Sequence, residues 1–362
     1  MRSIAKLMKD WQFTGPNGVT TAVELPHTWN ARDGQDGGND YWRGCCTYCT
    51  RFAAPVYDPA QQQVWLQFEG VNASAAVLLN GQQLCTHDGG YSTFRAEVTE
   101  LLQAENQLTV RVDNSVNDRV YPQKADFTFY GGIYRDVSLL VVNKNHIALG
   151  HFGDTGVKIT PTLKEGSADI RVETLVEGSG TVTVELLDAE GRTAAKGEGE
   201  NTFLHLDAPH LWNGVKDPYL YTCVVRLLQD GKPVDEVTTK VGLRSFSVDP
   251  KKGFFLNGRP YPLHGVSRHQ DRKGLGNAIT REMHDEDMAL IRELAASGEK
   301  TIVLISHRLA NVVEADRIYV MDAGTVAEQG TQEELLAQKG IYARLWNAQQ
   351  SLENYKKGGA PR

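Results

Sequence analysis

The sequence predicts a mainly β protein in which two sandwiches are followed by a small α/β segment. Two observations lead to this class. From residue 62 to about 248, apolar and polar residues alternate over short runs separated by turn-forming residues, which is typical of half-buried antiparallel strands. After residue 250 the apolar residues follow the period of an amphipathic helix. We therefore expect the sandwiches first and an α/β unit after them.

The first β region contains strands joined by tight turns. Apolar residues alternate in VWLQFEG (64–70) and in QLTVRVDNS (107–115). Between two further apolar runs lies Asn80-Gly81, a dipeptide that tolerates the positive φ angles of a two-residue hairpin turn. These patterns predict a sandwich or jelly roll over residues 1–145.

The second β region covers residues 146–248. Alternation recurs over residues 170–174 and 182–186, and Asp230-Gly231 marks another tight turn. A region of this size, with strands separated by regular turn signals, fits one immunoglobulin-like sandwich.

Residues 249–362 follow a different pattern. YPLHGVS (261–267) predicts a strand, and a helix is expected after Thr280, with Met288 and Ile291 on its apolar face. Three strands, KTIVLISH, RIYVMDAG and TVAEQG, and two helices are expected to follow. Thr331 and Glu334 form a capping-box pattern at the start of the first of these helices. The last helix should bury an apolar stripe made by Ile341, Leu345, Ala348 and Leu352.

Composition excludes several classes of partner. Lys and Arg number 38 against 45 Asp and Glu, a formal net charge of −7, which does not favour a surface for nucleic acid or anionic lipid. No run approaches the roughly 18 consecutive apolar residues that span a bilayer, and the opening residues lack the apolar core of a secretion signal. We expect a cytoplasmic protein that binds neither nucleic acid nor membrane.

The five cysteines include a cluster at Cys45, Cys46 and Cys49. Its C-x-x-C spacing can in principle hold a metal ion or a redox disulfide. The cluster also lies in a strand pattern, and no second Cys or His pair completes a site. We favour packed strand cysteines, and interpret Cys85 and Cys223 in the same way.

Several motifs in a fixed order connect residues 1 to about 294 with a known family. They are LPHTWNARDGQDGGNDYWRG, LNGQQLCTHDGGYSTFRAEVTE, DFTFYGGIYRDVSLL, LWNGVKDPYLYTC and FFLNGRPYPLHGVSRHQDR. This part closely resembles the N-terminal part of the family-2 glycoside hydrolases, specifically bacterial β-galactosidases. The resemblance implies a sugar-binding jelly roll (1–145), an immunoglobulin-like sandwich (146–248) and the start of a (β/α)8 barrel (249–296).

The resemblance also implies two substrate contacts for a galactoside-type sugar. Asp126 looks like the aspartate that reaches from the jelly roll to galactose, and His269 looks like the histidine at the end of the first barrel strand. Without the family resemblance, the sequence favours a different interpretation: Asp126 forms an ion pair with Arg135, and His269 is an ordinary loop histidine. The family often places a cation beside the pocket, for which Asp126 is the one candidate ligand. Asn39 and Asp40 are further candidates for the pocket lining.

The resemblance assigns no catalytic residue to this chain. Retaining glycosidases use two carboxyl groups about 5 Å apart, and in this family both are glutamates on later barrel strands. A barrel takes about 250 residues, so we expect a truncated barrel. Glu293 and Glu299 read as solvated charges. Three functions stay open: a hydrolase completed by another chain, a non-catalytic carbohydrate-binding module, and a chimeric reading frame without selected function. Association into homo-oligomers is a further expectation from the family.

Residues 298–350 resemble the end of an ABC transporter ATP-binding domain. KTIVLISHRLANVVEADRIYVMDAGTVAEQGTQEELLAQKGIYARLW carries this resemblance, which implies a C-terminal ABC fragment over residues 297–362. His307 would be the family's switch histidine, which contacts the γ-phosphate of ATP. The chain has no G-x-x-x-x-G-K-[ST] loop to cradle phosphates. We therefore expect no ATP binding.

Overall fold

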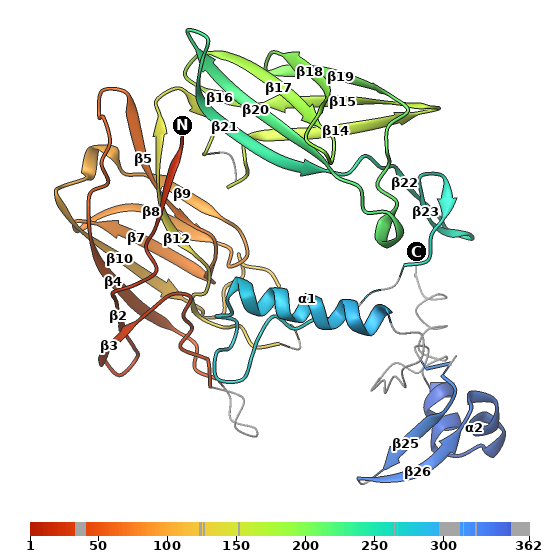
Figure 1. The fold of residues 1–362 in the computed structure, drawn as a ribbon. Helices are drawn as coiled ribbons and strands as arrows, with labels where there is room; N and C mark the ends of the chain where they lie inside the picture. The colour runs from red at the N-terminus through yellow and green to blue at the C-terminus, as the bar shows by residue number, and fades with distance from the viewer. Residues whose placement is uncertain are drawn as a thin grey trace, which may run out of the picture. The chain divides into compact units, whose positions relative to one another are not determined.

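The structure, a computed structural model, divides into two compact units, Met1–His284 and Asp285–Arg362. It describes residues 1–32, 41–122, 125, 127–150, 153–263, 265, 267–296, 312–313, 315–322 and 324–348. Strands dominate this part of the chain, so the prediction of a mainly β protein is confirmed (Figure 1). None of its helices is long and apolar enough to cross a membrane.

The first sandwich consists of antiparallel strands in two main sheets (Figure 1). The four-stranded sheet has the order β1 (Ser3–Lys6), β12 (Val137–Asn143), β5 (Gln62–Phe68) and β9 (Phe94–Glu97). The six-stranded sheet has the order β3 (Thr20–Val23), β2 (Trp11–Thr14), β4 (Cys45–Ala53), β10 (Glu105–Asp113), β7 (Ser74–Leu79) and β8 (Gln82–Asp88). Short strands β6 (Val71–Asn72) and β11 (Gly132–Ile133) pair with each other, and a 3-10 turn, η1, covers Thr99–Leu101.

The core of this sandwich lies where the alternation predicts it. Both patterned runs bury every second side chain completely: Val64, Leu66 and Phe68 from β5, and Leu108, Val110 and Val112 from β10. Asn80 and Gly81 have φ angles of 51° and 83° and connect β7 to β8. The sequence predicts this turn because both central residues of such a hairpin turn need positive φ angles. Asparagine and glycine adopt positive φ angles more readily than other residues.

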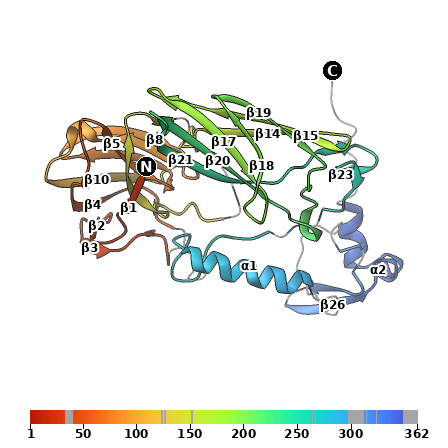
Figure 2. The ribbon, with the colours of Figure 1, turned by 45° about the horizontal axis from the view of Figure 1, so that its top comes forward.

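The second sandwich combines sheets of three and four strands. Their strands are labelled in Figure 2. The first sheet has the order β14 (Val157–Lys164), β15 (Ser167–Thr174) and β19 (Asn201–Asp207). The second has the order β18 (Thr193–Glu198), β17 (Thr181–Leu187), β20 (Tyr221–Gln229) and β21 (Lys232–Val241). A short pair, β13 (His146–Ile147) and β16 (Val176–Glu177), forms a separate two-stranded sheet, and the 3-10 turn η2 covers Gly214–Lys216. Asp230 and Gly231 form the predicted turn, with φ angles of 48° and 74°.

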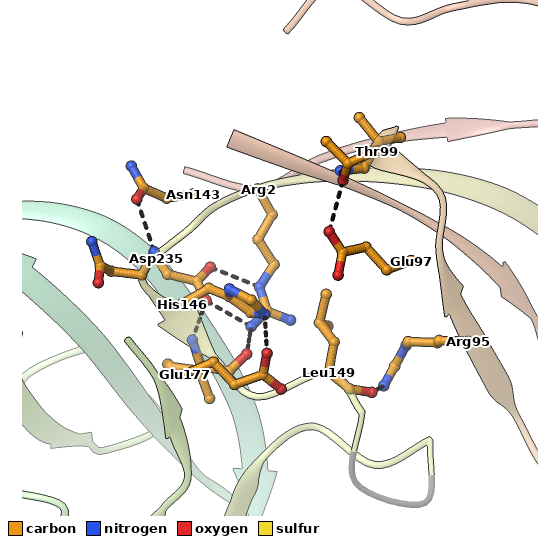
Figure 3. Close-up of polar contacts among 12 residues, drawn as sticks. Arg2, Arg95, Glu97, Thr99, Asn143, His146, Leu149, Glu177 and Asp235 are labelled. Atoms are coloured by element: carbon orange, nitrogen blue, oxygen red, sulfur yellow. Dashed lines mark hydrogen bonds and ion pairs between the residues drawn. The ribbon is translucent and has the colours of Figure 1, made fainter. Parts of the chain in front are cut away.

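An ion pair connects the two sandwiches (Figure 3). Arg2, next to β1, donates from Nε and Nη2 to the two carboxylate oxygens of Asp235 on β21, each at 2.7 Å. Arg2 Nη2 also donates to the carbonyl of Ile147, whose own N–H donates to Asp235. The Asp235 side chain is only 1% exposed and that of Arg2 17%. A bidentate, desolvated pair of this kind holds both partners in one geometry.

A second arginine adds to this junction. Arg95 on β9 donates from Nη1 to the carbonyls of Leu149 and Asp154, both at 2.8 Å. Its Nε donates to Gln67 Oε1. His146 is fully buried nearby, with Nε2 3.5 Å from a carboxylate oxygen of Glu177 (Figure 3). Side chains of the first sandwich thus bind Ile147, Leu149 and Asp154, and Asp235 of the second sandwich also binds Ile147.

Replacing Asp235 tests how much the ion pair between the sandwiches contributes to stability. We expect Asp235→Ala to lower the free energy of unfolding by about 3 kcal/mol, because it leaves the Arg2 charge buried without its carboxylate. Denaturant unfolding of the full chain measures the loss. Asp169→Ala is the matched control, since Asp169 pairs with Lys164 and His205 on an exposed face, and its loss should be much smaller. Equal losses would contradict the role given to Asp235.

His27 is a half-buried titratable group that packs against the first core. Its ring lies 4.9 Å from that of Phe13, and its Nδ1 is 2.7 Å from the Tyr48 hydroxyl. Burial lowers the pKa of His27 to about 4, because the charged imidazolium would be desolvated.

This pKa makes stability depend on pH. Between about pH 6.5 and 4 the unfolded chain binds a proton at His27 that the folded chain does not, so stability falls as the pH falls through this window. The expected loss is about 3 kcal/mol by pH 4. His27→Gln should flatten the measured dependence. His205→Gln should shift it in the opposite sense, because Asp169 raises the pKa of His205. A His27→Gln curve parallel to the original would contradict this assignment.

The segment after the second sandwich departs from the prediction. Residues 246–260 form a meander of β22 (Phe246–Asp249), β23 (Gly253–Leu256) and β24 (Arg259–Pro260). The barrel strand expected over residues 261–267 does not form at its described residues, 261–263, 265 and 267. A parallel barrel strand needs hydrogen-bonding neighbours on both sides, and none of the described strands pairs with this stretch. The helix α1 (Arg281–Ala296) does begin after Thr280, but Met288 is 46% exposed instead of buried.

The second unit contains an antiparallel hairpin and a capped helix. β25 (Ile318–Asp322) pairs with β26 (Thr325–Gly330), and α2 (Gln332–Gln338) follows. The predicted capping box of Thr331 and Glu334 is confirmed. RIYVMDAG and TVAEQG, two of the three predicted strands, pair antiparallel, since a two-residue link favours a hairpin. The predicted strand KTIVLISH lies outside the described residues.

The predicted apolar stripe of the last helix is also wrong at Leu345. Residues 341–348 are helical, but Leu345 is 52% exposed, whereas Tyr342 is 1% exposed and packs with Leu335, Ile318 and Val320. The carboxylate of Glu328 accepts hydrogen bonds from the N–H groups of Ile341 and Tyr342. This anchors the first turn of the helix to β26 and turns Tyr342 toward the hairpin.

The cysteine cluster lies on one strand, as expected. Along β4, Cys46 is buried and faces the core, whereas Cys45 is exposed and Cys49 is half-buried. In a strand, residues three apart point to opposite faces, so the C-x-x-C pair cannot close on one ion. Burial raises the pKa of the Cys46 thiol to about 12, which keeps it protonated and unreactive.

Candidate functional site

Of the predicted site residues, only His269 can be placed. Its side chain is exposed, on the loop that precedes α1. Asp126 and His307 lie outside the described residues, as do Asn39, Asp40 and Glu299. Glu293 is described and lies exposed on α1, in agreement with a solvated charge.

The loop that carries His269 is anchored to the first sandwich on both sides. Tyr130 Oη donates to Asp271 Oδ2 at 2.7 Å, and Arg135 Nη2 donates to Gln270 Oε1 at 3.0 Å. Both donors come from the strand region that follows Asp126 in the sequence. The loop and the segment next to Asp126 are therefore neighbours, although 130 and 271 are far apart in the chain.

His284 extends this anchor. Guanidinium nitrogens of Arg135 and Arg268 lie 2.8 and 3.0 Å from its two ring nitrogens. A neutral imidazole has one acceptor nitrogen, so only one of the two arginines can donate to it at a time. The alternative expectation for Arg135 was an ion pair with Asp126, and the described contacts of its guanidinium are with Gln270, His284 and the Tyr134 ring.

The loop closes through a turn that requires glycine. Arg272 N–H donates to the carbonyl of Gly276, and Gly276 N–H donates to that of Arg272. Gly276 has a φ of +55°, and a Cβ atom there would lie 2.7 Å from a ring carbon of Tyr130 and 2.9 Å from a methyl carbon of Thr28. The turn can approach the sandwich this closely only because residue 276 has no side chain.

A buried pair of amides fixes the segment beside Asp126. Asn30 and Asn114 are both fully buried, and Asn114 Nδ2 donates to Asn30 Oδ1 and to the carbonyl of Phe129. Asn30 Oδ1 also accepts from Gly131 N–H, and Asn114 Oδ1 from Gly44 N–H. Each amide is satisfied by several partners, as buried polar groups require. The sequence analysis did not predict this pair. The one indication in the sequence was that Asn30 belongs to the family motif LPHTWN.

The space beside this segment is small. Arg43, Tyr91, Tyr121 and Phe129 are among the residues that line a cavity of about 20 Å³. Such a volume is about that of one water. This cavity is too small for a sugar ring.

No group of three or more His, Cys, Asp or Glu side chains within the described ranges is arranged to hold a metal ion. The predicted cation beside Asp126 depends on a residue outside those ranges, so it stays a prediction.

Comparison with known proteins places the chain in a family. Three models match it in order: a glycosyl hydrolase 2 galactose-binding domain-like model over residues 38–162, glycosyl hydrolases family 2 over 151–244, and the family-2 TIM barrel domain over 248–356. The chain belongs to glycosyl hydrolase family 2. The resemblance deduced from the motifs is confirmed at this level.

The relatives of this family-2 chain carry two names. A beta-glucuronidase of Bacteroides fragilis is 36% identical over 315 residues, which are 81% of this chain and 45% of that protein. A beta-galactosidase of Thermoanaerobacterium thermosulfurigenes is 31% identical over 307 residues, 77% of this chain and 40% of that protein. The name beta-glucuronidase is the more frequent among them. The chain spans less than half the length of these relatives.

Solved structures agree with this placement. An FMN-binding beta-glucuronidase from Facaelibacterium prausnitzii L2-6 superposes with a TM-score of 0.77 at 38% identity, over 81% of this chain and 47% of that one. A Bacteroides uniformis beta-glucuronidase gives 0.71 at 29% identity, over 81% and 38%.

The comparisons do not support an ABC transporter segment or a chimera. Residues 248–356, which match the barrel model, include the stretch that resembles an ATP-binding domain. Isolated strand and helix patterns of about 50 residues recur in many α/β folds, which makes such a local resemblance a weak indication of function.

Substitution of Gly276 tests how the His269 loop is held. Alanine at φ +55° costs about 1–2 kcal/mol of backbone strain, and its methyl group would press on Tyr130 and Thr28. Gly274→Ala is the matched control, because Gly274 has a φ of +80° with no atom near its added Cβ. We expect Gly276→Ala to lose about 2 kcal/mol more than Gly274→Ala. Amide exchange over residues 268–280 should accelerate only in Gly276→Ala, and equal effects would contradict the close approach.

Proposed function

We propose that this chain supplies the sugar-binding part of a family-2 glycoside hydrolase that acts on a terminal β-glycoside. The observation that carries the proposal is the anchoring of the His269 loop against the sandwich segment that follows Asp126. A carboxylate from the sandwich and an imidazole from the loop would then meet one sugar, the carboxylate accepting hydroxyl protons and the imidazole making a polar contact.

Two substrate classes are consistent with the relatives. The motifs favour a β-galactoside, and the more frequent name among the relatives favours a β-glucuronide. A uronide carries a carboxylate that requires a cationic partner when it is desolvated. Arg268, next to His269 in the sequence, and Arg135, which donates to the adjacent Gln270, are candidates for that partner. We retain the galactoside as the first candidate and the glucuronide as the second.

Hydrolysis needs more than this site. We propose that turnover requires the two glutamates of later barrel strands, supplied by a longer polypeptide or by a complementing chain, and that this chain alone acts as a binding module. The pairing of two carboxyl groups about 5 Å apart is indispensable for the retaining mechanism.

Hydrolysis assays test the missing step. We expect the purified chain to release no chromophore from nitrophenyl β-galactoside or nitrophenyl β-glucuronide above a buffer blank. Turnover that disappears after a Glu-to-Gln change within the chain would show that it contains its own catalytic carboxyls, and would contradict the proposal.

Calorimetric titration tests binding separately. Non-hydrolysable thio-β-galactoside and thio-β-glucuronide would be titrated into the chain, and the tighter ligand identifies the substrate class. His269→Ala should weaken that binding about tenfold, equivalent to about 1.4 kcal/mol, whereas His205→Ala, an exposed histidine of the second sandwich, should not change it. Unchanged binding by His269→Ala would remove His269 from the site.

A further inference from the structure

A groove of about 460 Å³ opens on the first sandwich beside the hairpin of β2 and β3. Its volume lies in the range of small-molecule sites. Three aromatic side chains line it, together with small and polar residues of the turn. The lining residues are Phe13, Gly15, Pro16, Asn17, Val19, Thr21, Trp29 and Trp42. Among the described residues of the candidate site, His269 and its contacts Tyr130 and Arg135 are not part of this lining.

The aromatic rings of the groove are fixed in place. Phe13 and Trp29 are stacked, with ring centroids 6.0 Å apart and planes inclined by 17°. Trp42 meets Trp29 edge-on at 6.0 Å and 60°. Both indoles lie directly on glycine backbone: an added Cβ would come within 2.0 Å of Trp29 at Gly131 and within 2.5 Å of Trp42 at Gly44. These rings lose little freedom on binding, which favours affinity.

The buried amide pair supports this arrangement from below. Gly44 N–H donates to Asn114 and Gly131 N–H donates to Asn30, and the Trp42 carbonyl accepts from Asn30 Nδ2. The backbone under both indoles is therefore held by two fully buried side chains.

The polarity of the groove indicates its ligand. Among the described residues that line it there is no charged side chain. A carboxylate or phosphate would be desolvated there without a cationic partner, at considerable cost. A neutral pyranose suits the groove better, because the face formed by its axial C–H bonds packs on an aromatic ring while its hydroxyl groups stay at the polar rim. Asn17, whose Oδ1 accepts from Val19 N–H, and Thr21 provide that rim.

We propose that this groove is a second carbohydrate site, in which a neutral pyranose stacks on the Trp42 indole, the side chain that is 37% exposed. The site needs no catalytic group and does not depend on the proposed hydrolase function. It would hold a neutral sugar unit of a glycan on the sandwich, whatever sugar the His269 site recognises.

Tryptophan resonances test the proposal in the full chain. With ¹⁵N-labelled tryptophan, titration of methyl β-galactoside should shift the indole N–H signals of Trp29 and Trp42 to saturation and leave that of Trp212, in the second sandwich, unchanged. Glucuronate should bind there at least about tenfold more weakly. Absence of saturable shifts at Trp29 and Trp42, or equal affinity for glucuronate, would overturn the proposal.

Variants separate this groove from the His269 site. Trp42→Ala should weaken the binding read at Trp29 about tenfold, and Trp42→Phe should keep most of it, since stacking contributes about 1 kcal/mol beyond burial. If Trp42→Ala does not fold, Val19→Trp fills the groove from an exposed turn position and should have the same effect. His269→Ala should leave the Trp29 and Trp42 shifts unchanged. Shifts that persist in Trp42→Ala or vanish in His269→Ala would contradict a separate site.

Discussion

The bidentate pair of Arg2 and Asp235 is the constraint on which the arrangement of the two sandwiches depends. It joins a residue beside the first strand of one sandwich to a central position of β21 in the other, and it also holds the backbone of Ile147 between them. Because Asp235 is almost completely buried, a displacement of either sandwich would leave a charge without its partner. The hydrogen bonds of Arg95 to the carbonyls of Leu149 and Asp154 also hold the connecting segment against the first sandwich.

The candidate site depends in turn on this rigid first sandwich. Its Asn30 and Asn114 amides hold three backbone segments together, at Gly44, at Phe129 and at Gly131. One side of this framework receives the His269 loop through Tyr130, and another presents the stacked rings of Phe13 and Trp29. A single pair of buried amides thus supports two surfaces with different chemistry, one polar and titratable and the other aromatic and neutral.

The sequence predicted the features that depend on local patterns. Alternation placed Val64 and Val110 in the core. Residues within a few positions of one another also predicted two turns, the start of α1 and the Thr331 capping box; the turns are Asn80-Gly81 and Asp230-Gly231. It failed where distant partners decide. The expected barrel strand at 261–267 has no hydrogen-bonded neighbour among the described strands. Tyr342 is buried in place of Leu345 because Glu328 binds the first turn of the helix. The contact of Tyr130 with Asp271 joins residues 141 positions apart.

The pairing of β1 has a consequence for the order of folding during synthesis. β1 pairs with β12, where Ser3 faces Val141, and Arg2 then bonds to Asp235, so these early residues wait for segments that leave the ribosome much later. Contacts of such large sequence separation form slowly, because a long loop must be ordered first. Until then the edge of β12 that β1 covers has open hydrogen-bonding groups, and a neighbouring nascent chain could pair with it instead. The Arg2–Asp235 pair, which holds the residue next to β1, forms only after residue 235 has been made, so slow translation between residues 143 and 235 would prolong the time in which β1 can leave this edge.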